Sequence, residues 1–318
     1  MIFEGFSRPK ARDLSVMADD VLLHLPGRMT AVFDGASDSL GRRIDGVPVG
    51  RLAALAAARA ASALPLEAGD WPVEDILPRL STAIADDVPT EADEGPASTT
   101  AMIAFERPDG VRLVGIGDTG YRINGQQSHV QDLAPDGVTI PARVAAFRIL
   151  QGRGEAVETC EVAARMVIGQ GLDRAIEDGV LTKAEADKVT RSALEGLTGV
   201  AAEEALDLLG GGIQKQHRLA NAPDKNLAYG VLNGAVPDLR FAIDRHVDKT
   251  ALRSIEIFSD GYLRLPDDVS IAAWEALHAD IERLDPHKTQ HALAVKGSTR
   301  TQFFDDRTVA ILRHGGAG

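Results

Sequence analysis

The sequence has a single cysteine, Cys160, among its 318 residues. One thiol cannot form an intrachain disulfide bond, and it cannot supply a zinc cluster that needs several thiolates. No partner for a reactive thiol can be placed from the sequence. We therefore expect Cys160 to be a buried structural residue.

Long hydrophobic runs are also missing. The most apolar stretch, Leu52–Leu64, is rich in alanine, contains Arg59, and is too short to cross a bilayer. The segment Met1–Val16 has no apolar core of signal-peptide length. These absences predict a cytoplasmic protein without a membrane partner, and they carry no indication of its oligomeric state.

Positive charge is in short supply. The chain has 34 Lys and Arg against 47 Asp and Glu, a net charge of −13. Such a surface repels a phosphate backbone, so we expect no nucleic-acid partner. The acidic excess is explained either by a solubilising surface or, in part, by carboxylates that gather to hold metal ions.

Gly115, Gly117 and Gly120 have the spacing G-x-G-x-x-G of a dinucleotide-binding loop. That motif needs a helix after the loop, because the N-terminus of the helix receives the pyrophosphate. Here the strand-like segment Tyr121–Gly125 follows, and Asp118 places a negative charge inside the loop. The pattern therefore does not predict a dinucleotide site.

Other motifs with a known chemistry fail on similar grounds. The nucleophile elbow G-x-S-x-G does not occur, which argues against Ser-His-Asp chemistry. Lys296-Gly-Ser-Thr299 lacks the order G-K-[ST] of a phosphate loop, so we expect a surface loop, with Lys296 or Arg300 near a bound phosphate as the alternative. His287 and His291 lie in a polar segment after Pro286, which indicates a loop rather than a zinc-binding helix.

Alternating and helical periodicities predict a chain rich in both strands and helices. The expected strands are Val21–Leu25, Met29–Phe33, Ser98–Phe105, Val111–Ile116, Tyr121–Gly125, Ser254–Phe258 and Thr308–Leu312. The expected helices outside the middle of the chain are Val49–Leu64, Val73–Ala85 and Ile271–Arg283.

The middle of the chain, about residues 160–222, is predicted to be helical. Its expected helices are Val162–Ile176, Lys183–Leu197 and Ala201–Leu209, and Thr182 with Glu185 forms a capping box before the second. Because strand-rich segments precede and follow this block, we interpret it as an insertion into a single domain that spans residues 1–318.

Four aspartates lie at the ends of apolar strands. Asp34, Asp118 and Asp260 each follow a strand, and Asp305 precedes the last one. One such residue is most often part of a turn, but four in this arrangement favour carboxylates that converge at one edge of a sheet. Hard oxygen ligands of this kind suit Mg²⁺ or Mn²⁺, and two such ions can polarise a phosphoryl group and activate water.

Five short motifs occur in the order and approximate spacing of the PP2C family of metal-dependent protein phosphatases, which they resemble. They are Val32-Phe-Asp-Gly35, Ser98-Thr-Thr-Ala101, Gly117-Asp-Thr119, Phe258-Ser-Asp-Gly261 and Asp305-Asp-Arg-Thr-Val309. The resemblance covers Asp19 to Leu312 apart from the helical block. It implies an α+β fold, a four-layer α-β-β-α sandwich with two central antiparallel β-sheets.

The resemblance also implies roles for individual residues. Asp34 would bridge two metal ions, one of which the Gly35 carbonyl would reach. Asp260 and Asp305 would complete that pair, and Asp118 with Asp260 would bind a third ion. Asp19-Asp20 resembles the acidic pair of the family near the metal-bound waters, and Asp13 is a less well-spaced candidate for it. The catalytic residues so implied are Asp34, Asp260 and Asp20.

Some positions depart from the family pattern. Ser15 stands where the family has an arginine that holds the substrate phosphate, and Arg12 or Lys10 is the candidate replacement, since a guanidinium binds phosphate bidentately. Further departures are Ala36 and Ser37 at the position of a histidine in eukaryotic members, Thr119 and Gly120 for Ser-Arg, and Asp306 for an asparagine. The helical block lies where the family has its variable flap, so it is expected to influence substrate access.

The function implied is hydrolysis of phosphoserine or phosphothreonine on proteins, with Mg²⁺ or Mn²⁺, two and possibly three ions. A metal-activated water would attack phosphorus in line, without a covalent intermediate. The alternative is a catalytically weak or inactive module of the same fold that recognises a phosphorylated partner. The absence of the arginine at Ser15 favours the alternative, and the retained aspartates favour the enzyme.

Overall fold

The computed structural model describes residues 1–38, 40–90 and 95–315. Its contacts divide the chain into two compact units, and each is described by itself. The sandwich unit consists of Met1–Asp132, Gly230–Ala279 and Asp305–Gly318, and the helical unit consists of Leu133–Tyr229 and Asp280–Phe304.

Two five-stranded antiparallel sheets form the centre of the sandwich unit. The first has the order β1-β12-β11-β8-β9 and the second the order β10-β7-β6-β3-β2. The strands of the first sheet are β1 (Ile2–Arg8), β12 (Arg307–Arg313), β11 (Ser254–Phe258), β8 (Gly120–Ile123) and β9 (Gln127–His129). Those of the second are β10 (Ala242–Asp248), β7 (Gly110–Ile116), β6 (Thr99–Arg107), β3 (Met29–Gly35) and β2 (Val21–Leu25). A small two-stranded sheet, β4 (Arg43–Ile44) with β5 (Val47–Pro48), follows β3 in the chain.

The strands in the middle of each sheet are apolar on both faces, because both faces are covered. One cluster of buried side chains, including Val32, Met102, Ile257 and Leu312, comes from strands of both sheets. A second cluster lies between the second sheet and its helices, and includes Phe33 and Ile103. Burial on both sides explains why these strands read as nearly continuous apolar runs in the sequence.

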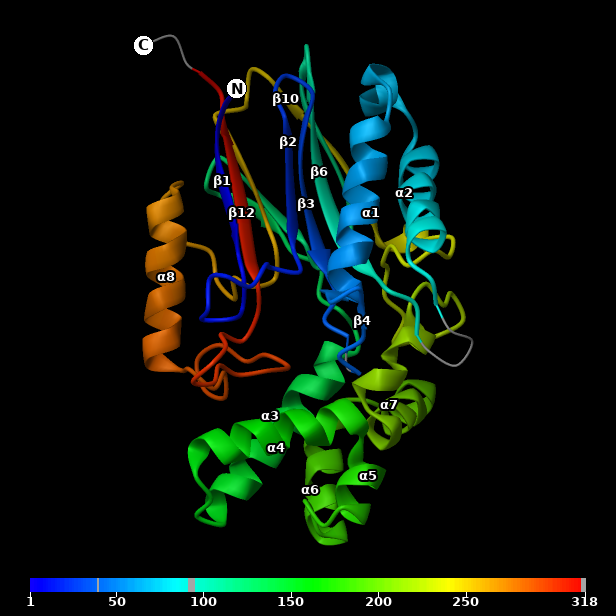
Figure 1. The fold of residues 1–318 in the computed structure, drawn as a ribbon, viewed down its shortest axis with the longest axis vertical. Helices are drawn as coiled ribbons and strands as arrows, with labels where there is room; N and C mark the ends of the chain where they lie inside the picture. Colours follow the sequence, from blue (N-terminus) through cyan, green and yellow to red (C-terminus); the bar gives the residue numbers. More distant parts are fainter. Residues whose placement is uncertain (39, 91–94, 316–318) are drawn as a thin grey trace. The chain divides into compact units, whose positions relative to one another are not determined.

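Helices cover the outer face of each sheet (Figure 1). α1 (Val49–Ala63) and α2 (Val73–Asp87), with the 3₁₀ turn η1 (Leu66–Asp70) between them, lie on the second sheet. α8 (Ile271–Leu284) lies on the first sheet, where Trp274 packs on Phe258 with ring centroids 4.7 Å apart. The sandwich unit is therefore an α-β-β-α structure, and the predicted fold class is confirmed.

The helical unit is larger than the predicted block. Its helices are α3 (Asp136–Gly152), α4 (Val157–Gln170), α5 (Leu172–Glu177), α6 (Lys183–Ala193) and α7 (Gly199–Gly211), followed by the 3₁₀ turn η2 (Ile213–Leu219). The single helix predicted over Val162–Ile176 is wrong: α4 and α5 are separated at Gly171, whose φ of 95° interrupts the helix. The capping box of Thr182 and Glu185 at the start of α6 is confirmed. Another 3₁₀ turn, η3 (Leu239–Phe241), belongs to the sandwich unit.

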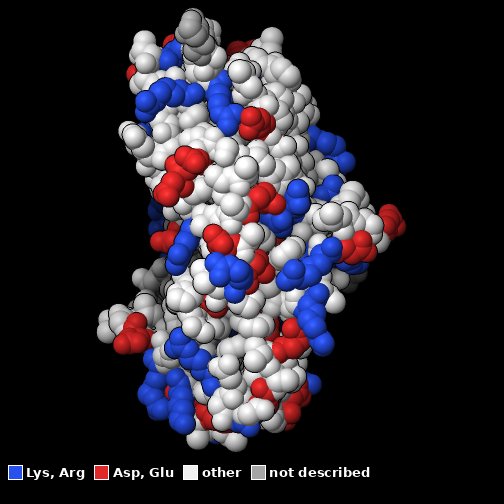
Figure 2. Space-filling view, turned by 90° about the vertical axis from the view of Figure 1, so that its left-hand side faces the viewer, with Lys and Arg blue, Asp and Glu red and all other residues white. Residues whose placement is uncertain are grey.

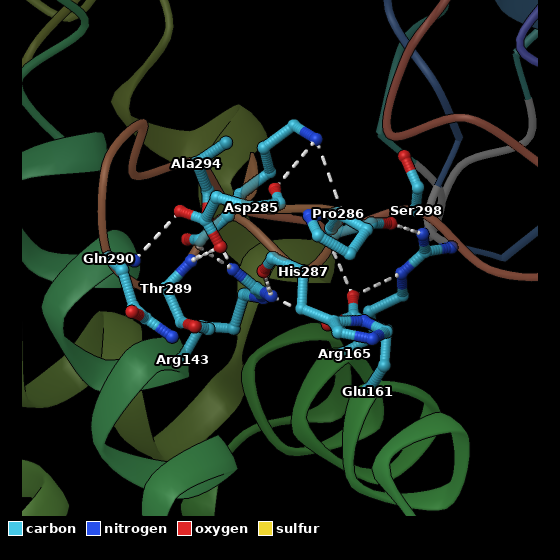
Figure 3. A network of polar contacts seen from close by, with 12 residues as sticks. Arg143, Glu161, Arg165, Asp285, Pro286, His287, Thr289, Gln290, Ala294 and Ser298 are labelled. Carbon is cyan, nitrogen blue, oxygen red and sulfur yellow. Dashed lines mark hydrogen bonds and ion pairs between the residues drawn. The ribbon is translucent and has the colours of Figure 1, made fainter. Parts of the chain in front are cut away.

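A network of buried charges connects the two chain segments of the helical unit (Figure 3). Arg143 of α3 donates to Glu161 of α4 at 2.6 Å, and neither side chain is exposed to solvent. The guanidinium of Arg143 also donates to the backbone carbonyls of His287, Lys288 and Ala294. This network therefore fixes the segment after α8 on the helices α3 and α4.

The charges on the surface are mixed. On the face drawn in Figure 2, the basic and acidic side chains of the described residues are interspersed. Within residues 1–38, 40–90 and 95–315, no helix combines the length and the apolar character that a bilayer crossing requires.

Candidate functional site

The directions of the strands bring the four predicted aspartates to the same end of their sheets. β3 and β7 both pair antiparallel with β6, so they run the same way, and Asp34 and Asp118 lie at their C-terminal ends. β11 pairs antiparallel with β12, so the end of β11, next to Asp260, lies beside the start of β12, next to Asp305. All four residues keep part of their surface accessible.

The aspartates from the two sheets approach one another. The backbone N–H of Asp260 lies 3.4 Å from Oδ2 of Asp34 and donates to it. Burial raises the pKa of Asp34 well above its usual range, and the charges of Asp20, Asp118 and Asp305 raise it further. The structure therefore places Asp20, Asp118, Asp260 and Asp305 around Asp34, while their roles stay predictions.

Asp20 is the most deeply buried of these carboxylates, with 2% of its surface exposed. Among the described residues, neither of its carboxylate oxygens has a partner in good hydrogen-bond geometry, although the hydroxyls of Ser259 and Thr308 lie near them. Burial and the charge of Asp306 raise its pKa, against the smaller opposing effect of the hydroxyls of Ser259 and Thr308. A buried carboxylate without partners is costly unless a proton or a cation satisfies it.

Hydroxyl groups from β6 support the loops that carry two of the aspartates. Thr99 donates from Oγ1 to the backbone carbonyl of Asp34 at 2.7 Å. Thr100 and Thr119 share a hydrogen bond of 2.6 Å between their hydroxyls, which fixes the loop of Asp118. These contacts give a structural reason for the Ser98-Thr-Thr-Ala101 motif.

Gly261 permits a close approach of two segments of the site. A Cβ atom at this position would overlap the backbone carbonyl oxygen of Asp306. We expect Gly261→Ala to lower the free energy of unfolding by about 1–3 kcal/mol, because one backbone must move away from the other. Urea unfolding measures this change.

Gly169→Ala is the matched control for that substitution, because Gly169 lies in α4 with nothing within 4 Å of the added Cβ. Gly169 lies in the last turn of α4, where alanine is more favourable than glycine by less than about 1 kcal/mol, so this variant should be unchanged or slightly stabilised. Equal stabilities of both variants and the parent would contradict the steric argument.

The basic residues near the N-terminus are placed differently from one another. Arg12 and Ser15 are exposed, and so is Asp13, whose carboxylate accepts from the backbone N–H of Ser15 at 3.0 Å. Lys10, in contrast, donates from Nζ to Asp19 at 2.7 Å, to Asp306 at 2.9 Å and to Ser37 at 2.8 Å. Lys10 is therefore a cation in direct contact with these acidic side chains.

The structure also places three features that the sequence analysis discussed as alternatives: the glycine pattern, the two histidines and Arg300. Gly120 begins β8, so a strand and not a helix follows the glycine pattern, as the sequence predicted. His287 and His291 lie outside helices, as predicted. In the helical unit, Arg300 is exposed and its guanidinium lies 3.9 Å from Glu158.

The donor set fits a divalent cation by its chemistry. Within residues 1–38, 40–90 and 95–315, no three His, Cys, Asp or Glu side chains are spaced as ligands of one metal ion. Carboxylates that repel one another are expected to stay apart until an ion draws them together. The oxygens of Asp34, Asp118, Asp260 and Asp305 are hard ligands of the type that Mg²⁺ and Mn²⁺ take, and Asp20 beside them has no other partner.

Ser259 and Thr308 are the residues of this site that the sequence did not single out. Their hydroxyls lie near Asp20, and Thr308 donates from its backbone N–H to Oγ of Ser259 at 2.9 Å. Both lie within the sequence motifs that contain Asp260 and Asp305, and this position in the motifs was the sequence signal that could have identified them.

Comparisons with known proteins give matches of fold only. No protein-family model and no curated protein matches the sequence. Serine/threonine phosphatase Stp1 from Staphylococcus aureus matches with a TM-score of 0.47 and 12% identity, over 99% of this chain and 95% of that one. The photosystem II phosphatase PBCP matches with a TM-score of 0.47 and 12% identity, over 98% of both chains.

A third solved structure is the catalytic domain of serine threonine protein phosphatase PstP in complex with two manganese ions. It has a TM-score of 0.41 and 15% identity, over 98% of this chain and 96% of that one. These proteins are PP2C-family phosphatases, the family that the sequence motifs resemble. Similarity at this level does not establish an activity or the residues that perform it.

Proposed function

We propose that this protein is a metal-dependent phosphatase that hydrolyses phosphoserine and phosphothreonine on proteins. The observation that supports the proposal is the gathering of Asp20, Asp34, Asp118, Asp260 and Asp305 at one end of the two sheets. These residues come from distant parts of the sequence, and burial together with the charges of Asp20, Asp118 and Asp305 raises the pKa of Asp34. A fold maintains such an arrangement at a cost in stability, which is typical of a functional site.

In this proposal, Asp34, Asp118, Asp260, Asp305 and the Gly35 carbonyl hold Mg²⁺ or Mn²⁺. The bound cations would supply Lewis acidity for the phosphoryl oxygens and a lowered pKa for water. Asp20, whose burial raises its pKa, is placed to hold and exchange a proton next to Asp34. The partly exposed aspartates leave the site open to a phosphorylated side chain.

Removal of the metal tests the proposal directly. With Mn²⁺, the protein should hydrolyse 4-nitrophenyl phosphate and a phosphothreonine peptide, and EDTA should lower both rates by about a hundredfold or more, because the cations provide most of the charge stabilisation. Excess Mn²⁺ should restore the activity. Full activity in EDTA would contradict the proposal.

A regulatory module that binds a phosphorylated partner without hydrolysing it is the second candidate. It is favoured by the position of Lys10, whose ammonium is directed to Asp19, Asp306 and Ser37 of its own chain, and by the exposed Ser15 in place of the arginine. Calorimetric titration with Mn²⁺ beside the turnover assay separates the two functions. Metal binding without turnover of either substrate would favour the module.

A further inference from the structure

Lys10 is the starting point of a further inference. Its ammonium group has three N–H bonds, and three acceptors take them: Asp19 at 2.7 Å, Asp306 at 2.9 Å and Ser37 at 2.8 Å. Its backbone N–H also donates to the other carboxylate oxygen of Asp306, at 2.7 Å. Lys10 therefore holds both oxygens of Asp306.

The surroundings keep Lys10 charged. Burial alone would lower its pKa, but the negative charges of Asp305, Asp306 and Asp19 outweigh burial and raise it. Its side chain is 24% exposed, while the side chains of Asp19 and Asp306 are 9% and 4% exposed. The ion pairs are therefore shielded from most of the solvent, where charges interact more strongly than at the surface.

Asp306 is the position at which the chain has a carboxylate in place of the asparagine of the family that it resembles. A carboxylate adds one negative charge next to Asp305, which is itself a predicted metal ligand. Lys10 adds one positive charge on the same carboxylate. The Lys10–Asp306 pair thus has the net charge of a neutral amide.

We infer that Lys10 is a resident cation of the acidic site, which neutralises Asp306 and Asp19 and thereby sets the affinity of the site for divalent ions. Its effect on metal binding rests on the proposed function, but its effect on the metal-free protein does not. In the absence of metal, Lys10 is the counterion of two buried carboxylates, so its loss should destabilise the fold.

The two partners are expected to act on metal binding in opposite directions. Lys10→Met removes a positive charge and keeps a side chain of similar length, so the affinity for Mn²⁺ should rise roughly tenfold or more. Asp306→Asn removes a negative charge, so the affinity should fall by a similar factor. The double variant should return to within about threefold of the parent, as expected for charges that offset each other.

Lys10→Arg is the matched control, because it keeps the charge, and its affinity should stay near that of the parent. Isothermal titration calorimetry with Mn²⁺ measures all five proteins. A merely structural role of Lys10 would weaken metal binding in both single variants. The inference would be overturned if Lys10→Met bound Mn²⁺ no more tightly than the parent does. It would also be overturned if Asp306→Asn did not bind Mn²⁺ more weakly than the parent.

Melting temperatures in EDTA test the metal-free part. Lys10→Met should melt lower by about 5 °C or more, because it leaves two buried carboxylates without the ammonium group of Lys10, and the added Asp306→Asn should recover part of that loss.

If none of the five proteins binds Mn²⁺, the proposed metal site is wrong, and the melting temperatures alone decide the role of Lys10. Equal melting temperatures of the parent and Lys10→Met in EDTA would overturn the inference about Lys10. If Lys10→Met does not fold, the double variant must fold and resemble the parent, and its failure to fold would also overturn the inference.

Discussion

Asp34→Asn is expected to remove Mn²⁺-dependent phosphatase activity almost completely, by roughly a thousandfold or more. Asp34 lies at the centre of the acidic residues, since Asp20, Asp118 and Asp305 all act on its pKa and Asp260 donates to its carboxylate. An amide has one oxygen fewer and no charge, so the bridging position between cations would be lost.

The same substitution should stabilise the metal-free protein. Removal of one of several carboxylates that repel one another is expected to raise the melting temperature in EDTA by about 2 °C or more. A loss of activity together with a gain of stability identifies a functional group rather than a structural one. A loss of both would indicate instead that Asp34 supports the fold.

Asp267→Asn is the control for this experiment. Asp267 is exposed and lies near Asp260 in the sequence, and the chemical change is the same. Its activity and its melting temperature should stay near those of the parent. Activity is measured with 4-nitrophenyl phosphate at saturating Mn²⁺, and retention of more than about a tenth of it in Asp34→Asn would contradict the bridging role.

Glu161→Ala is expected to lower the free energy of unfolding of the helical unit by about 3–5 kcal/mol. Glu161 is fully buried and accepts from Arg143 at 2.6 Å, from Arg165 at 2.9 Å and from the backbone N–H of Gly297 at 2.6 Å (Figure 3). Without it, the buried guanidinium of Arg143 keeps its backbone carbonyl partners among the described residues but loses the carboxylate in direct contact with its charge.

Tryptophan fluorescence and circular dichroism show which unit loses stability in Glu161→Ala. Both tryptophans, Trp71 and Trp274, belong to the sandwich unit, so their fluorescence reports that unit, whereas far-UV circular dichroism is dominated by helices. Urea unfolding should show the loss chiefly in the circular dichroism. A loss below about 1 kcal/mol would contradict the role of the buried pair.

Asp178→Ala is the matched control on the surface of the same unit. Asp178 accepts from Arg174 at 2.8 Å, but the two side chains are 36% and 58% exposed. Exposed pairs of this kind contribute about 0.5 kcal/mol or less, so this variant should unfold almost as the parent does. The comparison separates burial from charge pairing as the cause.

The strands that the sequence predicted are those with a strong local signal. The strands β2, β3, β6 and β7 were predicted because their apolar runs flank turn residues, Pro26-Gly27 in one pair and Asp109-Gly110 in the other. β1 and β10 were missed, since both lie at an edge of a sheet and several of their side chains are exposed. Helix α3 was missed because Gly137 and Pro141, which are typical of turns, lie within it.

The aspartates of the site could be predicted from the sequence, but the contacts between its residues could not. Aspartates at the ends of apolar strands pointed to Asp34, Asp118, Asp260 and Asp305, because strand ends meet at sheet edges. Lys10 was considered only as a ligand of phosphate, and its contact with Asp306 joins residues 296 positions apart. No local pattern carries information about a pair so distant, which depends on how β1 lies beside β12.

The charge network of the helical unit has a consequence for the order of events during synthesis of the chain. α3 and α4 leave the ribosome early, whereas Lys288, whose carbonyl Arg143 binds, is 145 residues later in the sequence than Arg143. Until that segment emerges, the guanidinium and Glu161 lack part of their native surroundings. The native packing of α3 and α4 is therefore completed only after this late segment has emerged, and until then their apolar surfaces are open to non-native contacts.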